Sequence, residues 1–125
     1  MDLYVGQVLD LLKELDLDEN TIVFFTSDNG AHKEGGHDPN YFNSSGGLRG
    51  IKRDLYEGGV RVPMIVWAPG RVPAGKVSDH IWAHWDIYPT LTELAGVQTS
   101  ATTDGISIVP AITGKGEAPT HRKLS

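Results

Sequence analysis

The sequence predicts an α/β fold in which helices pack on a mainly parallel sheet. Three observations support this class. The N-terminal segment repeats apolar residues at helical spacing, two internal runs are rich in β-branched and aromatic residues, and a second segment of helical spacing follows them. The order helix, strand, long loop, strand, helix and tail is typical of layered α/β proteins. A chain of 125 residues has the length of one domain, or of part of one.

The first predicted helix lies at the N-terminus. Its apolar residues recur at i, i+3, i+4, i+7 and i+10 and so form one stripe: Val5, Val8, Leu9, Leu12 and Leu15. The acidic run from Asp16 to Asn20 breaks this period and ends the predicted helix.

Two runs are predicted as strands. Thr21 to Thr26 and Val62 to Ala68 are apolar without polar alternation, the pattern of strands buried on both faces, and such strands usually lie in parallel sheets. Pro63 is tolerated at the start of the second strand, and Pro69-Gly70 ends it.

A long glycine-rich loop, Ser27 to Gly59, separates the two strands. A loop of this length within a compact domain is functional or disordered, and its aromatic and aliphatic residues favour an ordered, functional loop. The second predicted helix runs from Trp85 to Ala95, where Asp86 is a possible N-cap and Gly96 occupies the position after the C-cap.

Composition excludes several classes of function. A net charge of −5 with scattered basic residues argues against nucleic-acid binding. The absence of cysteine excludes disulfides, thiolate metal sites and a cysteine nucleophile within this chain. No run of 18 apolar residues is present, so no membrane span is expected.

Asp28 and Asn29 directly follow the first predicted strand. In open α/β sheets ligands collect at the carboxyl ends of strands, and carboxylate and amide oxygens suit Ca²⁺ or Mg²⁺. Asp-Asn-Gly is also a strong turn-forming sequence. The residues alone therefore leave two interpretations, a metal site and a plain turn.

A second cluster, Gly46 to Arg53, combines glycines with Arg49, Lys52 and Arg53. Converging backbone N–H groups and positive side chains suit a tetrahedral oxyanion, although a solvated loop has the same composition. The cluster is not a P-loop, and Lys33 stands where an EF-hand beginning at Asp28 needs glycine.

Histidines supply further candidates. His32 and His37 lie in the loop beyond Asp28, where they could contact a substrate or simply be exposed. His80 and His84 have the spacing of a helical zinc pair, but no third ligand is evident nearby.

Several motifs together resemble the sulfatase family, in particular arylsulfatases and N-acetylgalactosamine-6-sulfatases, over nearly the whole chain. They occur in the family's order and match the C-terminal part of its catalytic domain. The matching segments are Thr26 to Gly30, Gly50 to Lys52, Tyr56 to Pro63, Asp86 to Leu91, and Leu94 to Gly96.

The resemblance implies a partial alkaline-phosphatase-like fold and hydrolysis of sulfate esters, of a carbohydrate or an aryl group, at a Ca²⁺ site. It implies that Asp28 and Asn29 are metal ligands and that Lys52 is a catalytic residue that contacts the sulfate. His32 and His37 are candidates for the substrate pocket, and Glu57 and Arg61 for a buried ion pair that holds the loop. The parent protein is expected to be periplasmic, secreted or lysosomal.

The chain departs from the family because it has no cysteine and no Ser-x-Pro-x-Arg, from which the formylglycine nucleophile is made. We therefore expect residues 1–125 to be one partial domain, the C-terminal portion of a sulfatase catalytic domain, inactive alone and prone to self-association through uncovered surfaces. Two alternatives stay open: a phosphatase or phosphotransferase of the alkaline phosphatase superfamily, and a non-catalytic carbohydrate-binding module.

Overall fold

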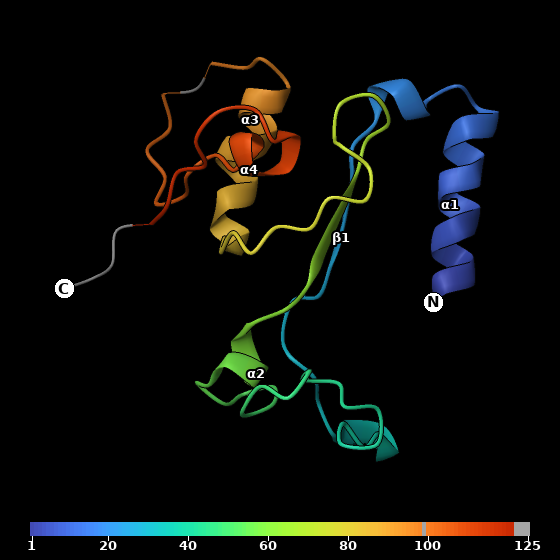
Figure 1. Cartoon of the computed structure of the whole chain (residues 1–125), viewed down its shortest axis with the longest axis vertical. Coiled ribbons are helices and arrows are strands. Elements are labelled where there is room, and N and C mark those ends of the chain that lie inside the picture. The colour runs from blue at the N-terminus through green and yellow to red at the C-terminus, as the bar shows by residue number, and fades with distance from the viewer. Residues whose placement is uncertain (99, 122–125) are drawn as a thin grey trace. The chain divides into compact units, whose positions relative to one another are not determined.

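The computed structural model describes residues 1–98 and 100–121, and Figure 1 shows its course. The chain forms two compact units. The strand-loop unit is Val23–Val66, and the helical unit holds residues 1–22 together with the chain from Trp67 onward. Among the described residues, no helix is both long and apolar enough to cross a bilayer.

The helical unit contains three α-helices and two short 3₁₀ turns within its described part. Both predicted helices are present, and α3 lies beside α4 (Figure 1). A helix in the C-terminal tail was not predicted, because five residues that include a proline are too few for a periodic signal. The bounds are Asp2–Glu14 for α1, Asp18–Asn20 for η1, His84–Asp86 for η3, Ile87–Leu94 for α3 and Val109–Thr113 for α4.

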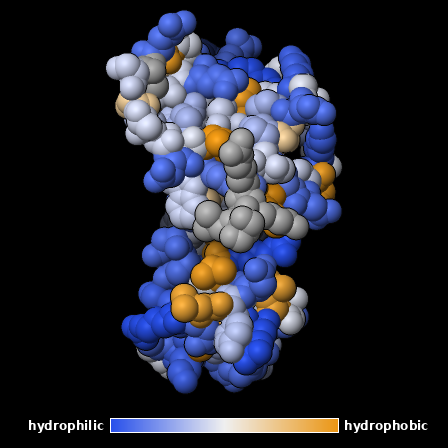
Figure 2. Space-filling model, turned by 90° about the vertical axis from the view of Figure 1, so that its left-hand side faces the viewer, coloured by the Kyte–Doolittle hydropathy of each residue, from blue (hydrophilic) through white to orange (hydrophobic). Residues whose placement is uncertain are grey.

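The apolar stripe of α1 is only partly covered within the described chain, since Val5, Leu9 and Leu12 are half-buried and Val8 and Leu15 are exposed. None of the residues of α1 is buried, and Leu3 and Val8 are 69% and 56% exposed. Hydrophobic residues outside α1 are exposed as well, and Figure 2 shows some of them set among hydrophilic ones. Exposed apolar area of this extent is typical of an interaction surface, so self-association stays a prediction.

The C-terminal end of α3 confirms the predicted glycine stop. Gly96 has a φ of +65°, in the left-handed region that glycine adopts without strain. The amide N–H of Val97 donates to the Thr92 carbonyl at 2.9 Å, and that of Gly96 to the Glu93 carbonyl at 3.0 Å. These bonds supply donors to carbonyls that have no hydrogen-bond partner within the last turn of the helix.

The two predicted strands form a two-stranded sheet with narrower bounds than expected. They are β1, Val23–Thr26, and β2, Met64–Trp67. The Thr26 hydroxyl donates to the Pro63 carbonyl at 2.9 Å, which places the end of β1 beside the start of β2. The strands therefore run in opposite directions (Figure 1) and are half-buried or exposed. Their apolar composition predicted burial on both faces and parallel pairing, but composition does not encode strand direction, and the described chain provides only partial cover.

The long loop contains two short helical turns. These are η2, Glu34–Gly36, and α2, Glu57–Val60. α2 was not predicted, since two of its four residues are glycines, which have low helix propensity. Contacts that are distant in sequence stabilise it, as described below.

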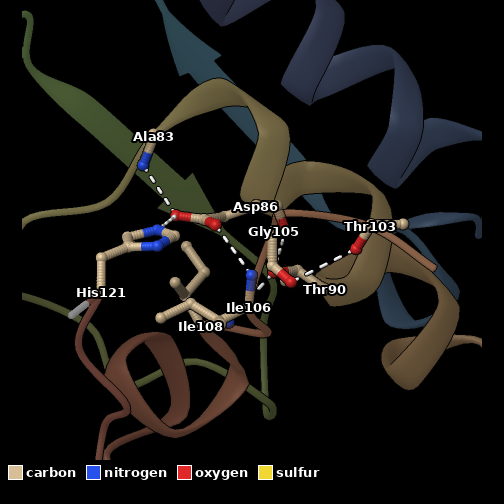
Figure 3. A network of polar contacts seen from close by, with 8 residues as sticks. All are labelled: Ala83, Asp86, Thr90, Thr103, Gly105, Ile106, Ile108 and His121. Atoms are coloured by element: carbon tan, nitrogen blue, oxygen red, sulfur yellow. Dashed lines mark hydrogen bonds and ion pairs between the residues drawn. The ribbon is translucent and has the colours of Figure 1, made fainter. Parts of the chain in front are cut away.

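A buried carboxylate organises the helical unit (Figure 3). Asp86 is 0% exposed, and its two oxygens accept hydrogen bonds from the backbone N–H of Ala83 at 2.8 Å and of Ile106 at 2.9 Å. His121 Nε2 lies 2.9 Å from Asp86 Oδ2. Asp86 therefore does not cap α3 as predicted, because its side chain bonds the preceding 3₁₀ turn and the tail instead.

Thr90, one turn further along α3, extends this network. Its hydroxyl donates to the Asp86 carbonyl at 2.6 Å and accepts from the Ile108 N–H at 3.0 Å. Thr90 and Ile108 are each 1% exposed. Since unpaired buried polar groups are costly, these bonds fix the segment around Ile106 and Ile108 against α3.

The ionisation of Asp86 links this network to pH. Burial raises the pKa of its carboxyl group, but the hydrogen bonds from His121, Ile106 and Ala83 outweigh burial, so the pKa lies below its usual value of 3.8. A carboxyl group whose pKa is lowered by folding stabilises the fold above the pKa of the unfolded chain. That contribution is lost as the pH falls through the lower folded-state pKa.

We predict that Asp86→Ala lowers the free energy of unfolding by about 3 kcal/mol at pH 7, because it leaves buried donors without an acceptor. Urea unfolding measures this loss, and amide hydrogen exchange at Ile106 localises it. The exposed Asp104→Ala is the matched control. Wild type should lose stability below about pH 4 by a step that the Asp86 variant lacks. Equal unfolding curves for the two variants would contradict the assignment.

Candidate functional site

The turn after β1 presents two oxygen-bearing side chains. The Ser27 hydroxyl donates to the Asn29 carbonyl at 2.8 Å, and Asn29 Nδ2 donates to the Gly30 carbonyl at 3.4 Å. This orientation leaves Asn29 Oδ1 available. The exposed Asp28 carboxylate makes no hydrogen bond or ion pair within residues 1–98 and 100–121. The segment can therefore be both a turn and a source of metal ligands, since the turn leaves Asn29 Oδ1 and the Asp28 carboxylate without protein hydrogen-bond partners.

Close backbone packing joins this turn to α2. The Gly30 N–H donates to the Gly59 carbonyl at 3.0 Å. A Cβ at Gly30 would lie 2.0 Å from the Gly58 carbonyl oxygen, and one at Gly59 would lie 2.2 Å from that of Asp54. No other residue type fits without displacing backbone, so these glycines allow the two segments to meet.

A second backbone contact brings the lysine loop to the same turn. The Lys52 N–H donates to the Ala31 carbonyl at 2.7 Å, and the Gly58 N–H donates to the Arg49 carbonyl at 2.8 Å. These bonds close the segment from Arg49 to Gly58 into a loop and fix the Lys52 backbone beside the residues that follow Asp28 and Asn29. The structure thus brings the predicted metal ligands and the predicted catalytic lysine into one neighbourhood.

The three basic residues of this loop differ in what they contact. The Arg49 guanidinium lies 3.7 Å from the centre of the Tyr56 ring, and its Nη2 bonds the Tyr56 hydroxyl at 2.7 Å. Arg53 forms an ion pair with Glu34. The Lys52 ammonium has no hydrogen bond or ion pair in the part of the chain that the structure describes. Lys52 is therefore the basic group of this loop that is left for an anion.

Glu34 ties the histidine segment to the lysine loop. The hydrogen bond from Arg53 and the Arg53 charge hold the pKa of Glu34 below its usual value, so the pair is charged at neutral pH. Glu34 lies between the candidates His32 and His37, and Arg53 is adjacent to Lys52. The φ of +81° at Arg53 is strained for an arginine, a feature that is enriched at functional sites.

His32 and His37 are exposed, and their ring centres lie 6.0 Å apart. The Glu34 N–H donates to His32 Nδ1 at 3.1 Å, which leaves Nε2 to carry the proton of the neutral ring. His37 stacks on Phe42 with ring centres 5.6 Å apart. Both histidines therefore belong to the segment that adjoins Lys52.

The prediction of a buried Glu57–Arg61 ion pair is wrong, and zinc at His80 and His84, which the sequence already disfavoured, gains no support. Glu57 and Arg61 pair at 3.4 Å, but their side chains are 63% and 53% exposed, so the pair is not buried and contributes little to stability. His80 Nε2 is buried without a partner, and His84 packs near Trp82. No group of three or more metal-ligating His, Cys, Asp or Glu residues occurs in the described ranges, which gives no support to zinc at His80 and His84.

The Asp28 and Asn29 oxygens fit a hard divalent cation in chemical type. Both are free of protein partners, and both lie on a turn fixed by backbone bonds. Two ligands are fewer than such a cation requires, so tight binding needs further oxygen ligands from water, substrate or other protein segments.

The oxygen-bearing Asp28 and Asn29 and the unpaired Lys52 are thus carried on two segments that backbone hydrogen bonds hold together at the end of β1. The chain belongs to the sulfatase family: the family model described as Sulfatase matches residues 1–97. The family prediction is therefore confirmed.

Known relatives agree with this membership. The chain is 42% identical over 116 residues to N-acetylgalactosamine-6-sulfatase of Canis lupus familiaris, covering 91% of this chain. It is 38% identical over 128 residues to steryl-sulfatase of Rattus norvegicus, covering 99% of this chain. In both comparisons it spans only 22% of the relative's length.

A solved structure gives the same fold. BT4656, in complex with its substrate D-glucosamine-2-N,6-O-disulfate, superposes with a TM-score of 0.72 at 30% identity, over 94% of this chain and 22% of that one. The predicted α/β class, as part of an alkaline-phosphatase-like sulfatase fold, is confirmed.

Sequence reasoning missed the three-glycine contact and the Arg49–Tyr56 pair. The Glu-Gly-Gly motif was the available signal, because adjacent glycines inside a helical turn indicate close backbone approach. Nothing in the sequence indicates that Gly58 and Gly59 meet Gly30, since that pairing is a long-range contact.

We predict that Gly30→Ala disrupts the site, because its Cβ overlaps the Gly58 carbonyl. The free energy of unfolding of the strand-loop unit should fall by about 3 kcal/mol or more, and amide exchange at Lys52 should accelerate. Gly6→Ala is the control, since a Cβ there meets nothing within 4 Å, and this helical position should gain up to about 1 kcal/mol. Unchanged protection at Lys52 in the Gly30 variant would refute the contact.

Proposed function

We propose that this chain is the C-terminal portion of the catalytic domain of a sulfuric ester hydrolase. The observation that carries the proposal is the unpaired Lys52 ammonium, whose backbone is bonded to the residues that follow Asp28 and Asn29. Family membership assigns sulfate, rather than phosphate, as the expected anion. Under this proposal the formylglycine nucleophile belongs to a part of the protein outside these 125 residues.

In the proposed site Lys52 binds a sulfate oxygen. Its ammonium offsets the negative charge of the bound group and the charge that develops on the ester oxygen as the bond to sulfur breaks. The backbone bond from Lys52 to Ala31 holds the base of the side chain, so little positional freedom is lost when the anion binds.

Asp28 and Asn29 would hold Ca²⁺ through one carboxylate and one amide oxygen. The ion, when bound, would act as a Lewis acid toward a sulfate oxygen. The contribution of this chain is to keep both oxygens unpaired on a fixed turn. His32 and His37 would line the pocket on the side of the segment tied to Arg53.

The proposed substrate is a sulfated carbohydrate. N-acetylgalactosamine-6-sulfatase and the BT4656 complex with a disulfated glucosamine support a sugar ester. Steryl-sulfatase is similar to this chain to a comparable degree. Family membership alone therefore does not decide whether the sulfate is esterified to a sugar or to a sterol.

We predict that the isolated chain binds 4-nitrophenyl sulfate weakly and does not hydrolyse it, because the chain lacks a nucleophile precursor. NMR titration should shift the Lys52 amide, and Lys52→Ala should weaken binding about tenfold, whereas Lys33→Ala should not. Light scattering on the same samples reports the expected self-association, which a monomeric mass would contradict. Turnover abolished by Lys52→Ala would overturn the partial-domain proposal, and equal binding by both lysine variants would overturn the role of Lys52.

We predict millimolar or weaker Ca²⁺ affinity for the isolated chain, since two protein ligands are far fewer than a tight site uses. Titration with CaCl₂ should shift the NMR signals of Asp28 and Asn29 before others. Asp28→Asn should abolish these shifts, whereas Asp104→Asn should leave them unchanged. Persistence of the shifts in the Asp28 variant would place the ion elsewhere.

A further inference from the structure

The sequence contains one Asn-Gly pair, Asn29-Gly30, which lies in the turn after β1. Such a pair can modify itself, because glycine has no Cβ to hinder its backbone nitrogen from reaching the carbon of the preceding side-chain amide. Asparagine is one of the thermolabile residues of proteins. Whether Asn29 reacts therefore depends on what surrounds the Gly30 nitrogen.

The reaction joins the Gly30 nitrogen to Asn29 Cγ. After the Gly30 N–H has lost its proton to a solvent hydroxide, the nitrogen attacks Cγ and the bond from Cγ to Nδ2 breaks. Nδ2 takes a proton from water and leaves as ammonia, and a five-membered succinimide remains. Water then opens this ring at either carbonyl and gives aspartate or isoaspartate. The sequence of steps needs water and hydroxide alone, without an oxidant or a reductant.

The side chain of Asn29 already lies beside Gly30. Its Nδ2 donates to the Gly30 carbonyl at 3.4 Å, and the Asn29 carbonyl accepts from the Ser27 hydroxyl at 2.8 Å. Asn29 is half-buried. The reacting amide is thus held next to Gly30, so the state of the Gly30 nitrogen decides whether the reaction starts.

The Gly30 nitrogen is both hydrogen-bonded and enclosed. Its N–H donates to the Gly59 carbonyl at 3.0 Å, and Gly30 is buried. The surrounding backbone leaves no spare room, since a Cβ on Gly30 would lie 2.0 Å from the Gly58 carbonyl oxygen and 2.9 Å from Gly59 Cα. A buried, hydrogen-bonded N–H exchanges its proton only after local opening. Deprotonation of Gly30 and its movement toward Asn29 Cγ therefore both require the Gly30–Gly59 contact to open.

We propose that Asn29-Gly30 is a self-modification site that the Gly30–Gly59 contact keeps inactive. While the contact is closed, Asn29 retains its amide. When the contact opens, Asn29 is converted to aspartate, which adds a negative charge beside Asp28, or to isoaspartate, which adds a methylene to the main chain. Because the contact has no spare room, the longer main chain displaces Gly30 from Gly59 permanently. This inference concerns the turn itself and does not depend on the proposed function.

Peptide mapping by mass spectrometry tests the proposal on the full 125-residue chain in mildly alkaline buffer, with amide exchange at Gly30 measured by NMR on the same samples. A synthetic peptide of residues 24–34 gives the unprotected rate. Asn29 in the chain should react at least about tenfold more slowly than in the peptide, and stepwise addition of urea should raise its rate in parallel with Gly30 exchange.

Gly59→Ala leaves the Asn-Gly pair intact but places a Cβ 2.2 Å from the Asp54 carbonyl oxygen. This variant should bring the reaction of Asn29 to within about threefold of the peptide rate, because the contact no longer closes. Val60→Ala, which shortens an exposed side chain of the same helical turn, is the matched control and should keep the wild-type rate.

Equal rates for Asn29 in the wild-type chain and in the peptide would overturn the proposal. A Gly59→Ala variant with fast Gly30 exchange and the wild-type rate at Asn29 would overturn it as well. If Gly59→Ala fails to fold, the wild-type chain in urea decides alone: parallel rates of Gly30 exchange and Asn29 reaction support the protective contact, and independent rates refute it.

Discussion

The candidate site depends on the close approach of three glycine backbones. Gly30 follows the metal-ligand candidates, and it meets Gly58 and Gly59 at separations that leave no room for a Cβ on Gly30. The bond from the Gly30 N–H to the Gly59 carbonyl and the bond from the Lys52 N–H to the Ala31 carbonyl depend on this approach. Asn29 and Lys52 are half-buried and Asp28 is exposed, so the backbone rather than a hydrophobic core sets the geometry of the site.

The charged residues around the site differ in whether they have protein partners. The Glu57–Arg61 pair is exposed and contributes little to stability, although the motif that contains it is part of the family pattern. Arg49 and Arg53 are engaged by Tyr56 and Glu34 and thereby shape the loop. Lys52 remains available because its neighbours satisfy one another. Lys52 interacts with the charge of Glu34 but forms no ion pair with it, so its ammonium can still bind a sulfate.

The sequence predicted the local elements well and the long-range ones poorly. Both longer helices, both strands, the glycine stop at Gly96 and the family were predicted, because each rests on periodicity, turn chemistry or motif order. Strand direction, α2 and the burial of Asp86 were not, since each depends on partners tens of residues away. Asp86 is the clearest example. Its place at the start of a predicted helix suggested an N-cap, but its side chain bonds Ile106 and His121, which are 20 and 35 residues away in the sequence.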